Sequence, residues 1–305
     1  MAIKWEGVMP AVTTKFTTDD QLDLKMFQTN IEAQLDAGVN GIILGGTLGE
    51  ASTLTYDEKR ELTRFTKELV GTKVPVIMNI AEQTTKGAIK AAEIAEEDGA
   101  SGLMMLPPMR YLADDRETTE YFRETAKSTS LPIMVYNNPI DYKIEVTLDM
   151  FEELLKEDNI QAVKESTRDI SNVTRIINRF DDRLKILCGV DTLAMESMIM
   201  GANGWVAGLV CAFPKETVAI YKLVKAGRIK EALEIYRWFL PVLELDINPK
   251  LVQNIKLAEV ATGIGTENVR APRLPLAGEE RKQVQAILDK AMAARPEITS
   301  EVLVS

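Results

Sequence analysis

Asn159-Ile-Gln-Ala-Val-Lys-Glu-Ser-Thr167 is a short apolar run that ends in a lysine. In a strand, side chains alternate between two faces, which puts Lys164 and Ser166 on one face and Glu165 on the other. A lysine on an interior face has a lowered pKa, because burial disfavours its charged form. The neutral amine that results can attack a carbonyl carbon and form a Schiff base. The structural alternative is a lysine at a strand end whose head group reaches solvent.

The same kind of apolar run occurs eight times along the chain. The eight strand candidates are residues 7–13, 41–45, 74–80, 102–106, 131–136, 160–165, 184–188 and 204–208. Segments with helical periodicity lie between them, for example residues 24–37, 55–70, 84–98 and 116–128. Near-continuous apolar strands separated by helices predict an α/β fold with a parallel sheet, and eight such units suffice to close a (β/α)8 TIM barrel.

A repeated connection supports this architecture. The segments at residues 37–42, 98–103 and 200–205 each place two glycines three positions apart just before a strand candidate. The first glycine suits the end of a helix, and the second suits the start of a strand that packs tightly on its neighbours.

After the eighth run the alternation stops. Residues 215–226 complete the last barrel helix, and residues 229–243, 250–262 and 279–294 have the pattern of three further helices. We therefore divide the chain into a barrel that carries the active site, residues 1–225, and a C-terminal helical appendix, residues 226–305. The tail from residue 295 shows no periodicity and is expected to be loosely held.

Composition narrows the possible chemistry. The 305 residues include no histidine and carry a net charge of −10. Without histidine there can be no His-based triad and no HExxH zinc site, and no nucleotide-binding glycine loop occurs, so we expect neither a metal nor a cofactor. The negative charge argues against nucleic acid and anionic membranes as partners. The sequence shows no secretory signal, no membrane span and no disulfide framework from Cys188 and Cys211, so we expect a cytoplasmic protein.

The candidate site residues lie where the strands of a barrel would end, because barrel enzymes carry their active sites at that face. Tyr136, on the strand next to Lys164, can exchange protons with an imine there; a core tyrosine is the alternative. The turn Gly45-Gly46-Thr47-Leu48-Gly49-Glu50 offers backbone N–H groups and a hydroxyl at a helix start, which suits a substrate carboxylate. An ordinary glycine turn is the alternative there. Asp191 is expected to cap the following helix.

Together these residues resemble the family of dihydrodipicolinate synthase and N-acetylneuraminate lyase, Schiff-base-forming aldolases on an eight-stranded barrel. The resemblance covers residues 5 to about 276. Its four motifs are Gly46-Thr47-Leu48-Gly49-Glu50, Tyr136-Asn137-Asn138-Pro139, Lys164-Glu165-Ser166-Thr167 and Gly204-Trp-Val-Ala-Gly208. They match the family's carboxylate-binding turn, catalytic tyrosine, imine-forming lysine and eighth strand, in that order.

The resemblance implies a role for each candidate residue. Lys164 forms the imine, Tyr136 relays protons, and Thr47 assists the tyrosine and binds the substrate carboxylate. The implied substrate-binding residues are Gly46, Leu48, Asn138, Gly189 and Val206. The family's chemistry uses a covalent lysine imine without a cofactor, acts on a small 2-oxo acid or cyclic imino acid, and is commonly carried out by homotetramers.

Three departures disfavour the synthase reaction itself. Leu48 stands where the synthase has a second hydroxyl residue. Met109 stands where it has a second relay tyrosine, with Tyr111 two residues later. Asp141 replaces the arginine that binds the carboxylate of the aldehyde substrate, and an aspartate repels that group.

Several blocks resemble instead the branch of 1-pyrroline-4-hydroxy-2-carboxylate deaminase, an enzyme of hydroxyproline degradation. They are Tyr136-Asn-Asn-Pro-Ile140, Gly204-Trp-Val-Ala-Gly208, Tyr236-Arg-Trp-Phe239, Leu251-Val-Gln-Asn-Ile-Lys256 and Arg270-Ala-Pro-Arg-Leu-Pro-Leu276. The alternative within enzymes is a retro-aldolase or dehydratase that acts on a sugar-derived 2-oxo acid. Outside enzymes, the alternative is a barrel that binds a 2-oxo acid as a sensor, and ligand-induced stabilisation without product would indicate it.

Overall fold

The computed structural model describes residues 3–299 and residue 302, and its core is one eight-stranded parallel sheet in the order β1-β8-β7-β6-β5-β4-β3-β2. The strands are β1 (Gly7–Pro10), β2 (Ile42–Leu44), β3 (Val76–Ile80), β4 (Gly102–Met105), β5 (Ile133–Asn137), β6 (Ile160–Glu165), β7 (Lys185–Cys188) and β8 (Gly204–Ala207). A parallel bridge between Ala11 and Ile43 joins the two ends of the sheet. The predicted (β/α)8 barrel is therefore confirmed.

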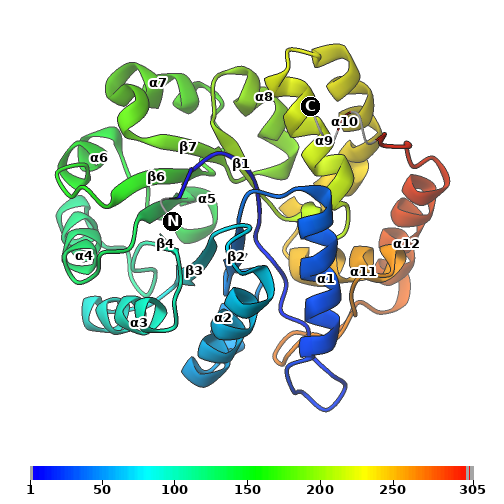
Figure 1. The fold of residues 1–305 in the computed structure, drawn as a ribbon, viewed down its shortest axis with the longest axis horizontal. Helices are drawn as coiled ribbons and strands as arrows, with labels where there is room; N and C mark the ends of the chain where they lie inside the picture. Colours follow the sequence, from blue (N-terminus) through cyan, green and yellow to red (C-terminus); the bar gives the residue numbers. More distant parts are fainter. Residues whose placement is uncertain (1–2, 300–301, 303–305) are drawn as a thin grey trace.

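Helices alternate with the strands and surround the barrel (Figure 1). They are α1 (Leu24–Ala37), α2 (Tyr56–Val70), α3 (Thr85–Glu97), α4 (Asp115–Lys127), α5 (Pro139–Tyr142), α6 (Leu148–Leu154), α7 (Ser171–Phe180), α8 (Ala194–Ile199) and α9 (Pro214–Lys225). The first four begin within one residue of the predicted starts, because each is preceded by an Asp or Thr whose side chain accepts a hydrogen bond from the first turn. The caps at Thr55 and Asp114 are complete capping boxes.

The repeated glycine connection takes the same form in all three copies. The first glycine has a positive φ in each, at Gly38, Gly99 and Gly201. The second begins a strand at close quarters: a Cβ on Gly204 would lie 2.3 Å from the carbonyl oxygen of Gly7 in β1. The polar residue before it ties two strands together, as where Asn40 accepts a hydrogen bond from Val8 N at 3.0 Å. The sequence pattern thus marks the points where helix ends meet tightly packed strand starts.

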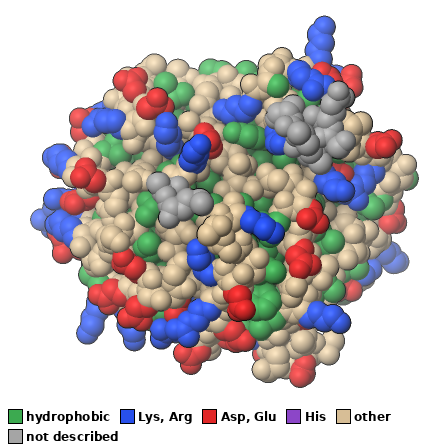
Figure 2. Space-filling view, viewed as in Figure 1, with side chains coloured by type: hydrophobic (Ala, Val, Ile, Leu, Met, Phe, Trp, Pro, Cys, Tyr) green, Lys and Arg blue, Asp and Glu red, His purple; other side chains and the backbone are tan. Residues whose placement is uncertain are grey.

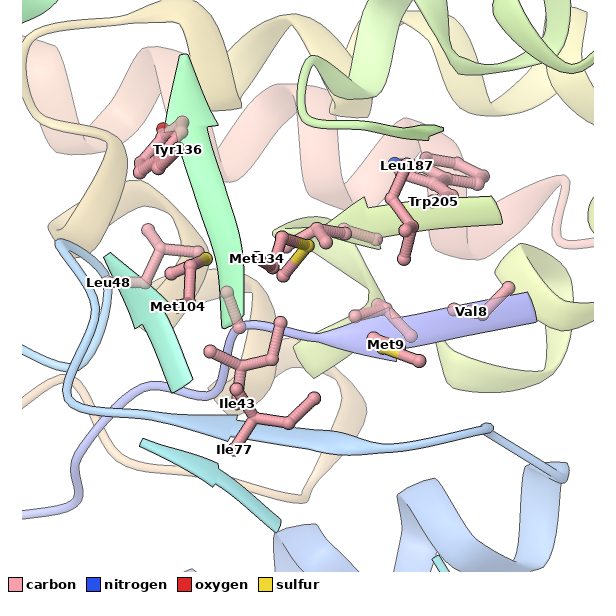
Figure 3. Close-up of a cluster of buried hydrophobic side chains, with 14 of the residues drawn as sticks. Val8, Met9, Ile43, Leu48, Ile77, Met104, Met134, Tyr136, Leu187 and Trp205 are labelled. Atoms are coloured by element: carbon pink, nitrogen blue, oxygen red, sulfur yellow. The ribbon is translucent and has the colours of Figure 1, made fainter. Parts of the chain in front are cut away.

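The strands are buried almost throughout, and their apolar side chains form one continuous core. Figure 3 shows that Tyr136 lies nearer than Met134 to the arrowhead of β5. Leu48 and Met104 lie on the same side of the core as Tyr136 in this view. Tyr136 therefore stands near the C-terminal end of its strand, one residue before β5 ends at Asn137.

Three further helices follow the barrel and lie together on one side of it in Figure 1. They are α10 (Ile229–Leu243), α11 (Leu251–Thr262) and α12 (Gly278–Ala293). This confirms the predicted helices of the appendix, whereas the domain division after residue 225 stays a prediction. Part of the predicted loose tail, residues 300, 301 and 303–305, lies outside the described residues.

Two fully buried ion pairs attach α11 to the barrel mouth. Lys15 lies 3.0 Å from Glu259, and Lys256 lies 2.6 Å from Glu50, and none of the four side chains is exposed. Glu259 also accepts a hydrogen bond from Thr13 Oγ1 at 2.7 Å. Because Thr13 and Glu50 follow the C-terminal ends of β1 and β2, these contacts fix the loops at the functional face of the barrel.

The outer surface mixes both signs of charge, and Figure 2 shows basic and acidic side chains interspersed on one face. Among the helices of the described residues, none is long and apolar enough to cross a membrane.

Candidate active site

A cavity of about 450 Å³ opens at the C-terminal ends of the strands. It brings together all eight candidate residues: Gly46, Thr47, Leu48, Tyr136, Asn138, Lys164, Gly189 and Val206. They come from the ends of β2, β5, β6, β7 and β8 and from the loops that follow. The barrel geometry alone accounts for this convergence, because parallel strands end at one face.

Lys164 lies inside the barrel mouth with only 8% of its surface exposed. Its Nζ lies 3.9 Å from the ring centre of Tyr136, the residue opposite it in the β5–β6 register. The described chain gives this amine neither a hydrogen bond nor an ion pair. Burial therefore lowers the pKa of Lys164, although Tyr142 and Asp246 partly oppose the shift.

The space around Lys164 depends on a glycine. A Cβ on Gly189 would lie 2.6 Å from Cε of Lys164 and 2.1 Å from Oγ of Ser166. Lys164 and Ser166 therefore share the inner face, as the alternation predicts. Glu165 points away and accepts hydrogen bonds from Thr167 N at 2.8 Å and Asn172 Nδ2 at 3.0 Å.

Tyr136 is placed to hold a proton beside the amine. Its hydroxyl accepts a hydrogen bond from Asn138 Nδ2 at 3.3 Å, and burial raises the pKa of Tyr136 to about 12. Its ring meets the ring of Tyr142 edge to face at 5.5 Å. At neutral pH the phenol is therefore a proton donor rather than a phenolate.

Thr47 hydrogen-bonds to a second tyrosine of the cavity. Its hydroxyl lies 2.6 Å from the hydroxyl of Tyr142, whose ring contacts that of Tyr136, and its assistance to Tyr136 stays a prediction. Tyr142 comes from the short helix α5, which begins at Pro139, and burial raises its pKa. No sequence pattern points to Tyr142, because it lies five residues beyond Asn137, where β5 ends.

The turn after β2 presents free backbone donors to the cavity. Gly45 has a φ of +63°, and its carbonyl accepts a hydrogen bond from Asn79 Nδ2 at 2.9 Å. In the described chain the N–H groups of Thr47 and Leu48 have no acceptor. Successive unpaired N–H groups of this kind form an anion-binding nest. The expected helix start is a short 3-10 helix, η1 (Ala51–Thr53), because α2 begins only at Tyr56.

Glu50 ties this turn to the appendix. Its φ is +54°, a left-handed conformation that is uncommon outside glycine. Besides the ion pair with Lys256, its carboxylate accepts a hydrogen bond from Arg270 N at 3.1 Å. The strained backbone at Glu50 is therefore held by groups from far along the chain.

Asp191 does not cap the following helix, so that expectation is wrong. Its carboxylate accepts hydrogen bonds from Trp205 Nε1 at 2.8 Å, Gly208 N at 3.1 Å and Leu209 N at 2.7 Å. It therefore anchors the C-terminal end of β8, next to Val206.

Other cavity residues carry charges that the site prediction did not include. Asp246, in η5 (Glu244–Ile247) of the appendix, and Arg168, after β6, both line the cavity. Asp141, which the sequence analysis singled out, also lines it, whereas Tyr111 lies outside it with 55% of its surface exposed. Asp246 lacked any sequence signal, because the appendix shows helical periodicity only.

The described residues contain no group of three or more His, Cys, Asp or Glu side chains that could hold a metal ion. A buried lysine without a charged partner, a phenol against it and an anion nest in the same barrel mouth define the class of Schiff-base-forming lyases. The Dihydrodipicolinate synthetase family model matches residues 4–291, so the chain belongs to this family. Enzymes of this family act through a covalent lysine imine and use no external cofactor.

Known proteins are similar to this chain in both sequence and structure. The 4-hydroxy-tetrahydrodipicolinate synthase of Exiguobacterium sibiricum is 31% identical over 275 residues, which cover 89% of this chain and 92% of the relative. The synthase of Methanosarcina barkeri is 30% identical over 290 residues, covering 94% and 98%. The synthase structure from Methylacidiphilum fumariolicum SolV has a TM-score of 0.90 at 27% identity, covering 95% and 97%. YagE from E. coli K12, solved with pyruvate, has a TM-score of 0.88 at 25% identity, covering 94% and 98%.

Proposed function

We propose that the protein converts 1-pyrroline-4-hydroxy-2-carboxylate into 2-oxoglutarate semialdehyde and ammonia through an imine on Lys164. The observation that carries the proposal is the buried, unpaired amine of Lys164 against Tyr136. The nest at Thr47 and Leu48 suits the single carboxylate of this substrate. Asp141 in the same cavity supports a substrate without a second carboxylate, because like charges repel in a partly buried site.

In the first stage, the neutral amine of Lys164 attacks C2 of the cyclic imine. The bond between C2 and the ring nitrogen then breaks, and the departing nitrogen takes one proton from the attacking amine and one from Tyr136. The product is an open chain whose C2 is bound to Lys164 as a protonated imine, with a primary amine on C5.

In the second stage, the protonated imine withdraws electrons and makes the C3 hydrogens acidic. Tyr136, now a phenolate, or a water that it holds, removes a C3 proton and leaves an enamine. The enamine electrons form a bond between C3 and C4 as the C4 hydroxyl leaves. Tautomerisation moves the unsaturation to the bond between C5 and its nitrogen. Water then hydrolyses this imine and releases ammonia, and a second water hydrolyses the imine at C2 and frees the semialdehyde from Lys164.

A second candidate is the synthase reaction of the named relatives, and Arg168 favours it. This residue lines the cavity, has a φ of +63° and makes no ion pair within the described chain. The guanidinium of Arg168 suits a second substrate carboxylate, whereas the negative charge of Asp141 would repel that carboxylate.

One experiment separates these functions. The protein is incubated with 1-pyrroline-4-hydroxy-2-carboxylate, and ammonia and semialdehyde are measured, while cyanoborohydride traps the imine for peptide mapping. Parallel samples receive pyruvate with a carboxylate-bearing aldehyde, or a sugar-derived 2-oxo acid with an assay for released pyruvate. Ammonia release with an adduct on Lys164 is the expected result. If no ammonia is released, condensation of pyruvate with the aldehyde would indicate the synthase reaction. Release of pyruvate from the sugar-derived acid would indicate a retro-aldolase.

Imine formation at Lys164 should accelerate as pH rises and level off below pH 10.5, the ordinary pKa of lysine. The rate of imine formation rises with pH because the neutral amine is the nucleophile, and the neutral fraction grows as pH passes through the lowered pKa of Lys164. The measurement is the rate of pyruvate trapping on Lys164 against pH. A midpoint at or above 10.5 would show an amine that behaves as if exposed.

Replacing Tyr136 with phenylalanine should lower kcat by about 10²–10⁴-fold, the range for loss of a general acid–base group. The KM should change less, because the ring that packs against Lys164 remains. Tyr111→Phe serves as the control, since Tyr111 is exposed and lies outside the cavity. If Tyr136→Phe and Tyr111→Phe had equal kinetics, Tyr136 would not be part of the proton relay.

We further propose a cytoplasmic homotetramer. Exposed apolar side chains at Leu112 and Ile140, 73% and 41% exposed, support an assembly that covers them. Light scattering coupled to size-exclusion chromatography measures the mass; a monomer at micromolar concentration would contradict this part of the proposal.

A further inference from the structure

Asp246 reaches the active-site cavity from the appendix, not from the barrel. It lies in η5, whose backbone is anchored where Asn254 Nδ2 donates a hydrogen bond to the carbonyl oxygen of Leu245 at 3.2 Å. Leu245 is buried on one side of this turn, and Glu244 is exposed on another. The turn is therefore held in place and aims Asp246 toward the barrel mouth.

A glycine at the end of β8 makes room for this side chain. A Cβ on Gly208 would lie 2.6 Å from Oδ1 of Asp246 and 3.2 Å from its Cγ. The backbone of Gly208 is in turn fixed by the carboxylate of Asp191. Two separate elements, β8 and η5, are thus fitted to each other around one carboxyl group.

The charged groups that act on Asp246 come from three elements, β6, α5 and the turn after β7. Burial raises the pKa of Asp246 well above its usual range, and the carboxylates of Asp191 and Asp141 raise it further, while Lys164 lowers it. The carboxyl group therefore holds its proton more strongly than an exposed aspartate. Asp141, the other acidic residue among the described cavity residues, instead accepts a hydrogen bond from Asn138 Nδ2 at 2.7 Å.

We propose that Asp246 is the catalytic acid that protonates the oxygen leaving from C4 of the Lys164-bound substrate. This rests on the proposed function, which requires a C4 hydroxyl to depart. Hydroxide is a poor leaving group, so the step needs a proton donor in the cavity, and Lys164 and Asp246 line the same cavity.

Loss of the C4 oxygen as water draws an electron pair from the enamine and a proton from Asp246. The electron pair of the enamine C2–C3 double bond becomes the new C3–C4 double bond, and the imine re-forms at C2. The C4–O bond breaks with its electron pair on oxygen, and that oxygen takes the carboxyl proton of Asp246. Water leaves, Asp246 becomes a carboxylate, and solvent at the open mouth returns its proton before the next turnover.

The test compares Asp246→Asn with Asp246→Glu and with Glu244→Gln, an exposed carboxylate on the same turn. Asp246→Asn should lower kcat for ammonia release by about 10²–10⁴-fold, with a smaller change in KM. In D₂O, substrate recovered from this variant should carry deuterium at C3, because the enamine still forms but the C4–O bond no longer breaks. Asp246→Glu should recover part of the rate, and Glu244→Gln should match the parent protein.

A second readout does not depend on the proposed substrate. Trapping of pyruvate on Lys164 should persist in Asp246→Asn, which also shows that the variant folds. Because the amide of Asp246→Asn resembles the protonated carboxyl group, the pH midpoint of trapping should stay close to the parental value. A midpoint that moves to lower pH would show that Asp246 is a carboxylate rather than an acid when Lys164 reacts, because a charge that raises the pKa of Lys164 would then have been removed.

The outcomes distinguish this inference from the proposed function. If the parent protein traps pyruvate but releases no ammonia from the pyrroline, the proposed function fails, and open-chain 4-hydroxy-2-oxo acids are then assayed for loss of water. Asp246 is confirmed as the acid if that loss collapses in Asp246→Asn. The inference is overturned if Asp246→Asn eliminates at the parental rate, if it loses trapping together with turnover, or if no 4-hydroxy substrate loses water.

Discussion

A Lys164→Ala protein should turn over its substrate at least about 10⁴-fold more slowly than the parent, because the covalent route disappears with the nucleophile. It should also give no trapped adduct with pyruvate. The loss should not come from misfolding, since the amine has no hydrogen bond or ion pair within the described chain. Removing an unpaired buried amine relieves a desolvation cost, and the variant should melt at or above the parental Tm.

The matched control is Lys156→Ala, which removes an exposed lysine that is 2.6 Å from Glu153. This variant should keep parental kinetics and parental trapping. Steady-state kinetics, peptide mapping and thermal unfolding on the three proteins decide the matter. Substantial turnover by Lys164→Ala would show that the imine is not on the reaction path.

The second large effect concerns stability. Lys256→Met should lower the free energy of unfolding by about 3 kcal/mol, the lower end of the range for breaking a buried ion pair, because the carboxylate of Glu50 loses its nearest cation and keeps only Arg273 at 3.7 Å and the N–H of Arg270. Denaturant unfolding at neutral pH measures this. The comparison is Lys250→Met, which breaks an exposed pair with Glu280 and should cost less than about 1 kcal/mol.

A double variant sharpens this prediction. Replacing Glu50 with glutamine in the Lys256→Met background removes the buried charge that lost its nearest cation, so part of the lost stability should return. Because Glu50 also holds the turn that carries Thr47, we expect the KM to rise in Lys256→Met. Similar costs for Lys256→Met and Lys250→Met would mean that the buried pair is no stronger than a surface pair.

Much of this fold could be predicted because the local sequence patterns favour the same helices and strands that the barrel requires. The capping residues at Thr55 and Asp114 mark helix starts by themselves, and the paired glycines mark strand starts. Because parallel strands end at one face, Lys164 and Tyr136 could be expected to lie together, whereas the roles of Thr47 and Val206 came from the family resemblance.

The remaining features depend on side-chain directions in loops, which no periodic pattern encodes. Thr47 hydrogen-bonds to Tyr142 of α5, whereas the family resemblance implied only that it assists Tyr136. Asp246 enters through the tertiary placement of η5 against Gly208. The relatives carry the synthase name, so the substrate branch rests on the chemistry of the cavity and on the experiments above.

The burial of Lys164 also makes the pH response of this protein a property of its shape. A chain without histidine has no side chain whose ordinary pKa lies near neutrality, so its working range is set by how strongly the barrel mouth excludes water. Any substitution that hydrates the mouth, even one in the appendix, moves the amine back toward the behaviour of a surface lysine. The pH optimum thus reports how polar the surroundings of Lys164 are. Homologues that share Lys164 and Tyr136 should still differ in pH optimum wherever their appendices pack differently against the barrel.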